Sequence, residues 1–258
     1  MSISVAAPET PARALALFAH PDDPEFVAGG LIARWTAAGS RVGYVIMTDG
    51  RAGGAGLGEE HPTPDALVAR RQDEQRAAGL ALGVQPDDIV FLGYHDGELF
   101  HTLDLRRQLV REIRRFQPDA AILFDPQRRL LPGYIQHPDH WTSGEAALAA
   151  LAPLAGNRLA FPELLAEGWE PHQVRDIYLT SAMQPNLAVD ISATLEHKIA
   201  AMQLHTSLVA EPDRLAGLLR DMSHAAAAGS GHEFAEIYHY LRFGERNLRQ
   251  LEGEASAT

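Results

Sequence analysis

The sequence feature that most constrains the fold is a regular alternation of short apolar runs with longer helical patterns. The apolar runs have the length of buried strands and cover residues 14–19, 42–48, 89–92 and 120–124. Between them, the spacing of the apolar residues predicts helices over 25–38, 66–82 and 105–116. Such alternation predicts βαβ units, and therefore a parallel sheet with helices on both faces.

The second half of the chain continues the pattern less regularly. Short strands are expected at 177–180 and 187–190, followed by helices at 194–205 and 212–228. A length of 258 residues suits one large α/β domain, and no linker rich in proline, glycine or serine divides the chain. We therefore expect a single domain over 1–258, a Rossmann-like three-layer fold with a mostly parallel sheet. Residues 1–13 and 253–258 are expected to be flexible ends.

Charged residues are concentrated directly after the first apolar run. One imidazole and three carboxylates fall within six residues, at His20, Asp22, Asp23 and Glu25. A turn from a strand into a helix opens at the carboxyl edge of the sheet, where ligands collect and the new helix presents free N–H groups. Each acid taken alone is explained more simply as a helix cap or a first-turn acid.

A second cluster more than a hundred residues later favours chemistry over capping. It reads QHPDH over residues 136–140, with Pro138 suited to the first position of a helix. Imidazole and carboxylate together bind zinc, and a catalytic zinc keeps three protein ligands and one open position. We expect His20, Asp23 and His140 to be the ligands. Asp22 and His137 then lie unligated beside the metal, where hydrolysis needs a base and a second polar group.

Composition narrows the possible partners. The chain has no cysteine, so any metal must be held by histidine, aspartate or glutamate. With 22 basic against 34 acidic residues, a general nucleic-acid binder is excluded. No apolar run has the length of a membrane span or a signal peptide, so we expect a cytoplasmic protein with no membrane partner.

Several motifs, taken in order, resemble one known family. They are AHPDD at 19–23, TDG at 48–50, Arg71-x-x-Glu74, FLGYHDGEL at 91–99, PGYIQHPDH at 132–140 and a run from Lys198 to about His205. Between about residues 15 and 205 the chain is similar to the PIG-L (LmbE-like) family of zinc-dependent N-acetylglucosaminide deacetylases. The resemblance implies a metal-dependent hydrolase that removes an acetyl group from an N-acetylated amino sugar or its conjugate. Zn²⁺ is the expected cofactor, with another divalent metal as the alternative.

This reaction assigns roles to the residues beside the metal. The metal polarises the amide oxygen and lowers the pKa of its bound water. Asp22 is expected to be the general base, and His137, as an imidazolium, to hold the oxyanion together with the metal. Asp139 is expected to orient His137. Either Asp22 or His137 returns a proton to the leaving amine.

Other residues are expected to bind the substrate. The resemblance implies that Arg71 reaches the substrate and that Asp96 accepts a sugar hydroxyl, although a solvated pair of Arg71 with Glu74 is the alternative. Tyr134 is a third candidate, as an oxyanion donor. An anionic aglycone such as malate would suit four arginines: Arg51, Arg71, Arg128 and Arg129. We also expect a homo-oligomer.

Three alternatives stay open at this point. A zinc amidohydrolase of the same scaffold could act on a different amide. A nucleotide-binding α/β protein is disfavoured, because the five glycines of residues 49–65 follow the second strand and lack the G-x-G-x-x-G spacing. That loop is expected to be a mobile surface loop, or a lid over the substrate. A non-catalytic metal-binding or sugar-binding module would have no use for the unligated Asp22.

Overall fold

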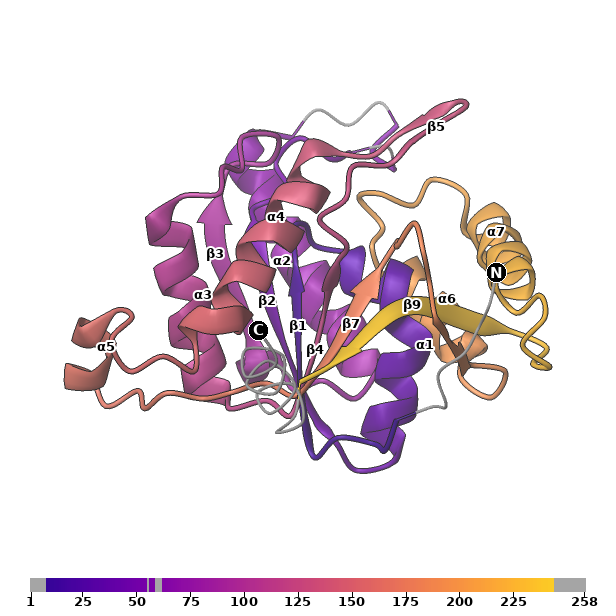
Figure 1. The fold of residues 1–258 in the computed structure, drawn as a ribbon. Coiled ribbons are helices and arrows are strands. Elements are labelled where there is room, and N and C mark those ends of the chain that lie inside the picture. The colour runs from indigo at the N-terminus through magenta and orange to yellow at the C-terminus, as the bar shows by residue number, and fades with distance from the viewer. Residues whose placement is uncertain (1–7, 55, 59–61, 244–258) are drawn as a thin grey trace.

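The computed structural model describes residues 8–54, 56–58 and 62–243 and confirms the predicted α/β architecture (Figure 1). The strands are β1 Arg13–Phe18, β2 Arg41–Thr48, β3 Ile89–Tyr94, β4 Ala120–Phe124, β5 Leu130–Leu131, β6 Tyr134–Ile135, β7 Asp176–Thr180, β8 Leu187–Asp190 and β9 Ala235–Arg242. The helices are α1 Asp23–Ala37, α2 Pro64–Ala81, α3 Leu103–Phe116, α4 Pro138–Ala149, α5 Pro162–Ala166, α6 Leu195–Gln203 and α7 Pro212–Ala226. None of the helices in these described ranges is both long and apolar enough to cross a membrane.

The central sheet has the strand order β3-β2-β1-β4-β7-β9-β8. The first five strands are parallel, whereas β9 runs antiparallel to β7 and β8 antiparallel to β9. A separate hairpin, β5–β6, precedes α4. The mostly parallel sheet is therefore as predicted, and the antiparallel part is confined to one edge.

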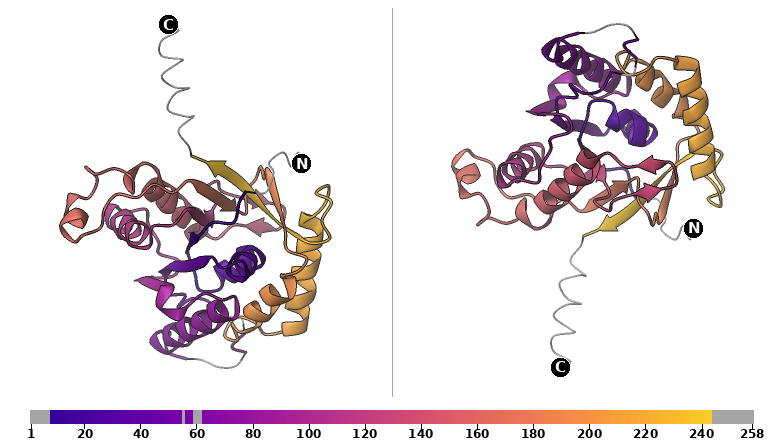
Figure 2. Two further views of the ribbon diagram at one scale, coloured as in Figure 1. Left: turned by 90° about the horizontal axis from the view of Figure 1, so that it is seen from below. Right: turned by 90° about the horizontal axis from the view of Figure 1, so that it is seen from above.

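Both faces of the sheet are covered, because alternate residues of each strand point to opposite sides. In β1, Ala14, Ala16 and Phe18 join one core cluster, and Leu15 and Leu17 join another. Helices α1, α2 and α6 contribute to the first cluster, whereas α3 and α4 contribute to the second. Figure 2 shows these two helical layers on opposite sides of the sheet.

The parallel register brings the ends of the strands to one edge. Ala16 of β1 pairs with Tyr44 of β2 on one side and with Ile122 of β4 on the other. The segments that follow β1, β2, β3 and β4 therefore leave the sheet at the same edge, which is where the charged residues of the sequence gather.

Some elements differ from the sequence prediction. The strand β9 and the hairpin β5–β6 were not predicted. In β9 the acidic Glu236 interrupts the apolar pattern, and it can be buried because it accepts hydrogen bonds from Lys198 and from backbone amides of α1. The ordered chain begins before residue 14, because Arg13 belongs to β1 and the Ala12 carbonyl accepts from Arg41. The expected flexible residues 1–7 and 253–258 lie outside the described residues.

The helix that carries the second histidine cluster, α4, packs directly against β4. A Cβ added at Gly144 would lie 2.4 Å from the carbonyl oxygen of Phe124, closer than real side chains come. Only glycine therefore allows α4 to lie this near the strand.

We expect Gly144→Ala to lower the free energy of unfolding by about 1–3 kcal/mol, because the added methyl group overpacks this contact. The matched control is Gly217→Ala in α7, where nothing lies within 4 Å of the new Cβ. That change should raise the free energy of unfolding by up to about 1 kcal/mol through helix propensity alone. Urea denaturation measures both, and equal effects would contradict the packing argument.

Candidate active site

The turn from β1 into α1 has an unusual backbone at Asp22. Its φ angle is 96°, a left-handed conformation that favours glycine, and its side chain makes no capping hydrogen bond. The carboxylate of Asp23 accepts a hydrogen bond from the backbone N–H of His20 at 2.7 Å. Neither acid is therefore a simple helix cap, and strain of this kind is often found at functional sites.

Asp22 is held by a buried arginine. The guanidinium of Arg71 donates to Asp22 Oδ1 at 2.8 Å, to the Pro21 carbonyl at 2.7 Å and to the Gly50 carbonyl at 2.7 Å. Burial and the neighbouring Asp23 raise the pKa of Asp22 to about 6, although Arg71 opposes the shift. A carboxylate with this pKa is ionised at neutral pH and is more basic than an exposed aspartate.

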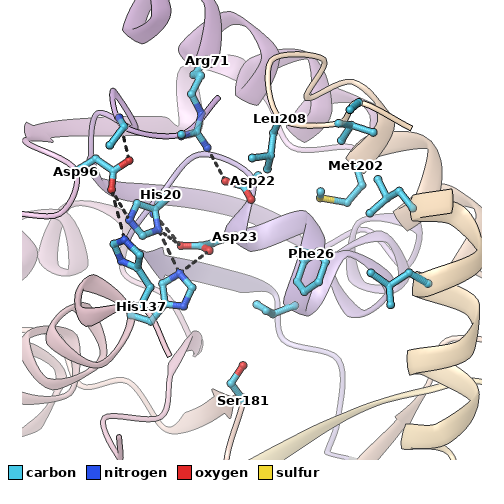
Figure 3. A pocket seen from close by; sticks show the side chains of 18 of the residues that line it. His20, Asp22, Asp23, Phe26, Arg71, Asp96, His137, Ser181, Met202 and Leu208 are labelled. Atoms are coloured by element: carbon cyan, nitrogen blue, oxygen red, sulfur yellow. Dashed lines mark hydrogen bonds and ion pairs between the residues drawn. The ribbon is translucent and has the colours of Figure 1, made fainter. Parts of the chain in front are cut away.

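Three side chains from the two sequence clusters meet beside Asp22 (Figure 3). His20 Nδ1 lies 3.2 Å from His140 Nε2 and 3.4 Å from Asp23 Oδ2, and His140 Nε2 lies 3.2 Å from Asp23 Oδ1. Two imidazole nitrogens and a carboxylate thus converge from the turn between β1 and α1, from the first residue of α1 and from α4. This group can hold a metal ion.

A second group with metal-binding potential shares His20. Its other ring nitrogen, Nε2, lies 3.1 Å from Asp96 Oδ1 and 3.3 Å from Asp139 Oδ2, and His137 Nε2 lies 3.9 Å from Asp96 Oδ1. Burial alone would lower the pKa of His20, but hydrogen bonds with three carboxylates raise it well above its ordinary value. The surroundings of His20 therefore favour positive charge.

The carboxylate of Asp139 contacts a different imidazole from the one expected. Its carboxylate contacts His20 and accepts hydrogen bonds from the backbone N–H groups of Gly97 at 2.7 Å and Leu99 at 3.3 Å. The contact of Asp139 with His137 is made by its backbone N–H, which donates to His137 Nδ1 at 3.3 Å. Asp139 therefore orients His20 through its carboxylate, and His137 caps α4.

This cap also bears on the protonation of His137. Because Nδ1 accepts from the backbone, the ring proton of neutral His137 is on Nε2. Burial and the neighbouring His20 lower the pKa of His137, which favours the neutral ring over the expected imidazolium. His137 can still donate a hydrogen bond through Nε2.

Comparison with known proteins places this arrangement in a family. The model of the PIG-L family, described as GlcNAc-PI de-N-acetylase, matches residues 15–151. The chain belongs to the PIG-L family.

Two groups of relatives resemble it over most of their length. The diacetylchitobiose deacetylase of Thermococcus kodakarensis is 31% identical over 229 residues, covering 87% of this chain and 81% of the relative. A probable N-acetyl-α-D-glucosaminyl L-malate deacetylase 2 of Bacillus anthracis is 30% identical over 195 residues, covering 75% and 80%. The structure of N,N'-diacetylchitobiose deacetylase from Pyrococcus horikoshii, complexed with its inhibitor MPG, superposes with a TM-score of 0.81 at 29% identity, covering 90% and 84%.

The histidine–aspartate groups of this PIG-L protein open into a cavity of about 780 Å³. Three of the predicted substrate residues line this cavity: Arg71, Asp96 and Tyr134. The alternative pairing of Arg71 with Glu74 is wrong, because Glu74 bonds Arg70 and Ser207. Arg51 pairs with Asp49 and is not part of the lining. Contact of these residues with substrate stays a prediction.

The described part of the glycine-rich loop forms one rim of the cavity. Ala52 and Gly53 line it, and the Gly50 carbonyl accepts from Arg71. The Gly56 N–H donates to the Ser207 carbonyl, which joins the loop to the segment before α7. Residues 55 and 59–61, part of the expected lid, lie outside the described residues.

Sequence reasoning missed Gln75, which supports the strained turn from α2. Its amide oxygen accepts from the Asp22 backbone N–H at 2.8 Å, and its amide nitrogen donates to both oxygens of buried Glu25 at 2.9 and 3.0 Å. Glu25 Oε2 also lies 3.3 Å from His205 Nε2. The available signal was the position of Gln75 four residues after Arg71, on the same face of the helix.

We expect Gln75→Leu to lower the free energy of unfolding by about 1–3 kcal/mol, because the buried polar groups of Asp22 and Glu25 lose their partner. Gln108→Leu is the control, since the Gln108 amide donates hydrogen bonds to Tyr94 and Asp104 near the surface of α3. Urea denaturation should show a clearly smaller change there. A Gln75 variant as stable as the Gln108 variant would remove Gln75 from the support of the turn.

Proposed function

We propose that this protein is a metal-dependent N-deacetylase that hydrolyses the acetamide of an N-acetylglucosamine-type amino sugar or conjugate. The observation that carries the proposal is Asp22, a carboxylate of raised pKa that lies beside a three-donor metal group without being part of it. A non-catalytic sugar-binding or metal-binding module would not need a strained, basic carboxylate at this place. The relatives named above, which act on acetylated amino sugars, support the same reaction.

His20, Asp23 and His140 would hold the metal, which we propose to be Zn²⁺. His20 Nδ1 lies 3.2 Å from His140 Nε2 and 3.4 Å from Asp23 Oδ2, and His140 Nε2 lies 3.2 Å from Asp23 Oδ1. Two imidazole nitrogens and a carboxylate this close together are a donor set that suits Zn²⁺. The contacts of His20 Nε2 with Asp96 and Asp139 support this choice over the second group, since a metal-bound histidine usually donates its other N–H to a carboxylate. When bound, the metal would polarise the amide oxygen and acidify the attacking water.

Asp22 would accept the proton of the attacking water. Its bond to Arg71 fixes the direction of the carboxylate, and the strained backbone turns Asp22 away from Asp23, so that adjacent residues serve different roles. The proton that Asp22 takes up is then available for the leaving amine, because the lowered pKa of His137 makes that ring a poor source of a proton.

His137 would stabilise the oxyanion of the tetrahedral intermediate as a neutral donor through Nε2–H. The cap on α4 supports this role, because it holds the ring and its proton before substrate arrives. Asp96 and Tyr134 are proposed to contact the sugar from the walls of the cavity. The cytoplasmic location and the homo-oligomer expected from the sequence stay predictions.

The metal ligands are tested by His140→Ala. We expect this variant to lose most of its zinc and keep its fold, because the core clusters on both faces of the sheet consist of apolar side chains other than His140. His197→Ala, an exposed histidine on α6, is the matched control and should keep full zinc. Elemental analysis and circular dichroism give the two readouts, and full zinc in the His140 variant would exclude that ligand.

The reaction itself is tested by Asp22→Asn, which keeps the shape of the side chain but removes its basic oxygen. We expect kcat for deacetylation of N,N'-diacetylchitobiose or N-acetylglucosaminyl malate to fall roughly 10²–10⁴-fold with the metal retained. Activity and zinc are measured on the same preparation. Loss of zinc would indicate that Asp22 is a ligand, and full activity with full zinc would contradict the proposed mechanism.

A further inference from the structure

The cavity has a second half that the proposed chemistry does not use. Six large apolar residues line it: Phe26 of α1, Met202 of α6, Leu208 and Val209 of the segment between α6 and α7, and Leu215 and Leu218 of α7. In Figure 3, Phe26, Met202 and Leu208 lie on the opposite side of Asp22 and Asp23 from Asp96 and His137. The metal-binding groups therefore lie at a polar end, and an apolar wall continues from it.

The apolar wall is held in place by the rest of the fold. Phe26, Val209 and Leu215 pack against a core cluster formed with α6 and α7. The segment before Leu208 is fixed by Glu74, whose carboxylate accepts from Ser207 Oγ at 2.6 Å and from Ser207 N–H at 2.9 Å. The wall is thus preformed, and Leu218 keeps 49% of its surface exposed at its edge.

Polar partners are scarce in this half. The charged residues that line it are Glu211 and Arg214, which pair with each other at 3.3 Å and are largely exposed. Of the four arginines considered for an anionic aglycone, Arg51, Arg128 and Arg129 do not line the cavity, and Arg71 bonds Asp22 at its polar end. A hydroxyl-rich or anionic group placed here would leave water without gaining hydrogen bonds.

The volume of the cavity leaves room for a ligand larger than one amino sugar. About 780 Å³ lies in the upper part of the range of about 300–1,000 Å³ that is typical of sites for drug-sized ligands. A single amino sugar at the polar end leaves the apolar half free. An apolar ligand group in that half binds favourably, because it removes the apolar surface of the wall from water.

We propose that the apolar half of the cavity is a subsite for an alkyl or aryl group carried by the amino-sugar substrate. This inference rests on the proposed function and names its substrate class. The apolar group has two chemical sources, the aglycone of the sugar or the acyl chain of the amide. In either case each buried methylene should raise kcat/KM roughly three- to four-fold until the wall is filled.

Two substrate series distinguish the sources. The first consists of the methyl, butyl and octyl glycosides of N-acetylglucosamine, and the second of glucosamine carrying acetyl, butanoyl or octanoyl groups. We expect kcat/KM of the zinc-loaded protein to rise at least ten-fold along one series. A flat or falling profile in both series, with the methyl glycoside deacetylated, would overturn the subsite and leave the proposed function standing.

Binding to the Asp22→Asn protein gives a readout that does not depend on turnover. Calorimetry below the critical micelle concentration should show tighter binding of the long-chain member of the series in which kcat/KM rises. Tighter binding without any deacetylation by the unmodified protein would support the subsite and defeat the proposed function. Equal binding of short and long chains would overturn the subsite directly.

A matched pair of variants on α7 locates the effect. Leu218→Ser changes a residue of the wall, whereas Met222→Ser changes a residue one turn later that is similarly exposed, at 45% against 49%, and does not line the cavity. The ratio of long-chain to short-chain kcat/KM, or of the two affinities, should fall several-fold in the Leu218 variant and stay unchanged in the Met222 variant. Equal ratios in both variants would overturn the assignment.

Discussion

The parallel pairing of β1 with both β2 and β4 is the constraint on which the active site depends. This register brings the turn after β1, the glycine-rich loop after β2 and the start of α4 to one edge of the sheet. The contact of Gly144 with β4 then sets the depth at which α4 presents His137 and His140. Residues more than a hundred positions apart thus meet within hydrogen-bonding distance because backbone ladders fix their starting points.

Much of this could be predicted from the sequence, because the central strands are apolar on both faces. Runs such as Ala14–Ala19 and Ala120–Phe124 allow few structures other than buried parallel strands, and the polar residues that follow them must lie where the strands end. The grouping of His20, Asp23 and His140 follows from that reasoning together with the family resemblance. The lengths of α2, α3 and α7 were predicted to within two residues.

The rest depends on distances that no local pattern encodes. The partner of the Asp139 carboxylate is His20, and it is set by how β3 and α4 approach each other across the edge of the sheet. The orientation of His137 depends on one backbone N–H, and its lowered pKa depends on burial and on the neighbouring His20. The role of Gln75 depends on how α2 packs beside the turn. The strand β9 was missed because the acidic Glu236 breaks its apolar pattern. The hydrogen-bond partners that allow this acid to be buried lie on α1 and α6.

The place of β9 in the sheet also bears on how the protein is synthesised. β8 has β9 as its neighbour in the sheet, and β9 is translated more than forty residues after it. The residues that could hold a metal ion all precede residue 141, and strands β1 to β4 can pair while the ribosome is still adding the second half. Apart from Phe26, the apolar wall is carried by α6, α7 and the segment between them, which lie between β8 and β9 in the chain. The nascent protein can therefore assemble the polar end of its cavity early, whereas Leu218, the last residue of the apolar wall, is translated later.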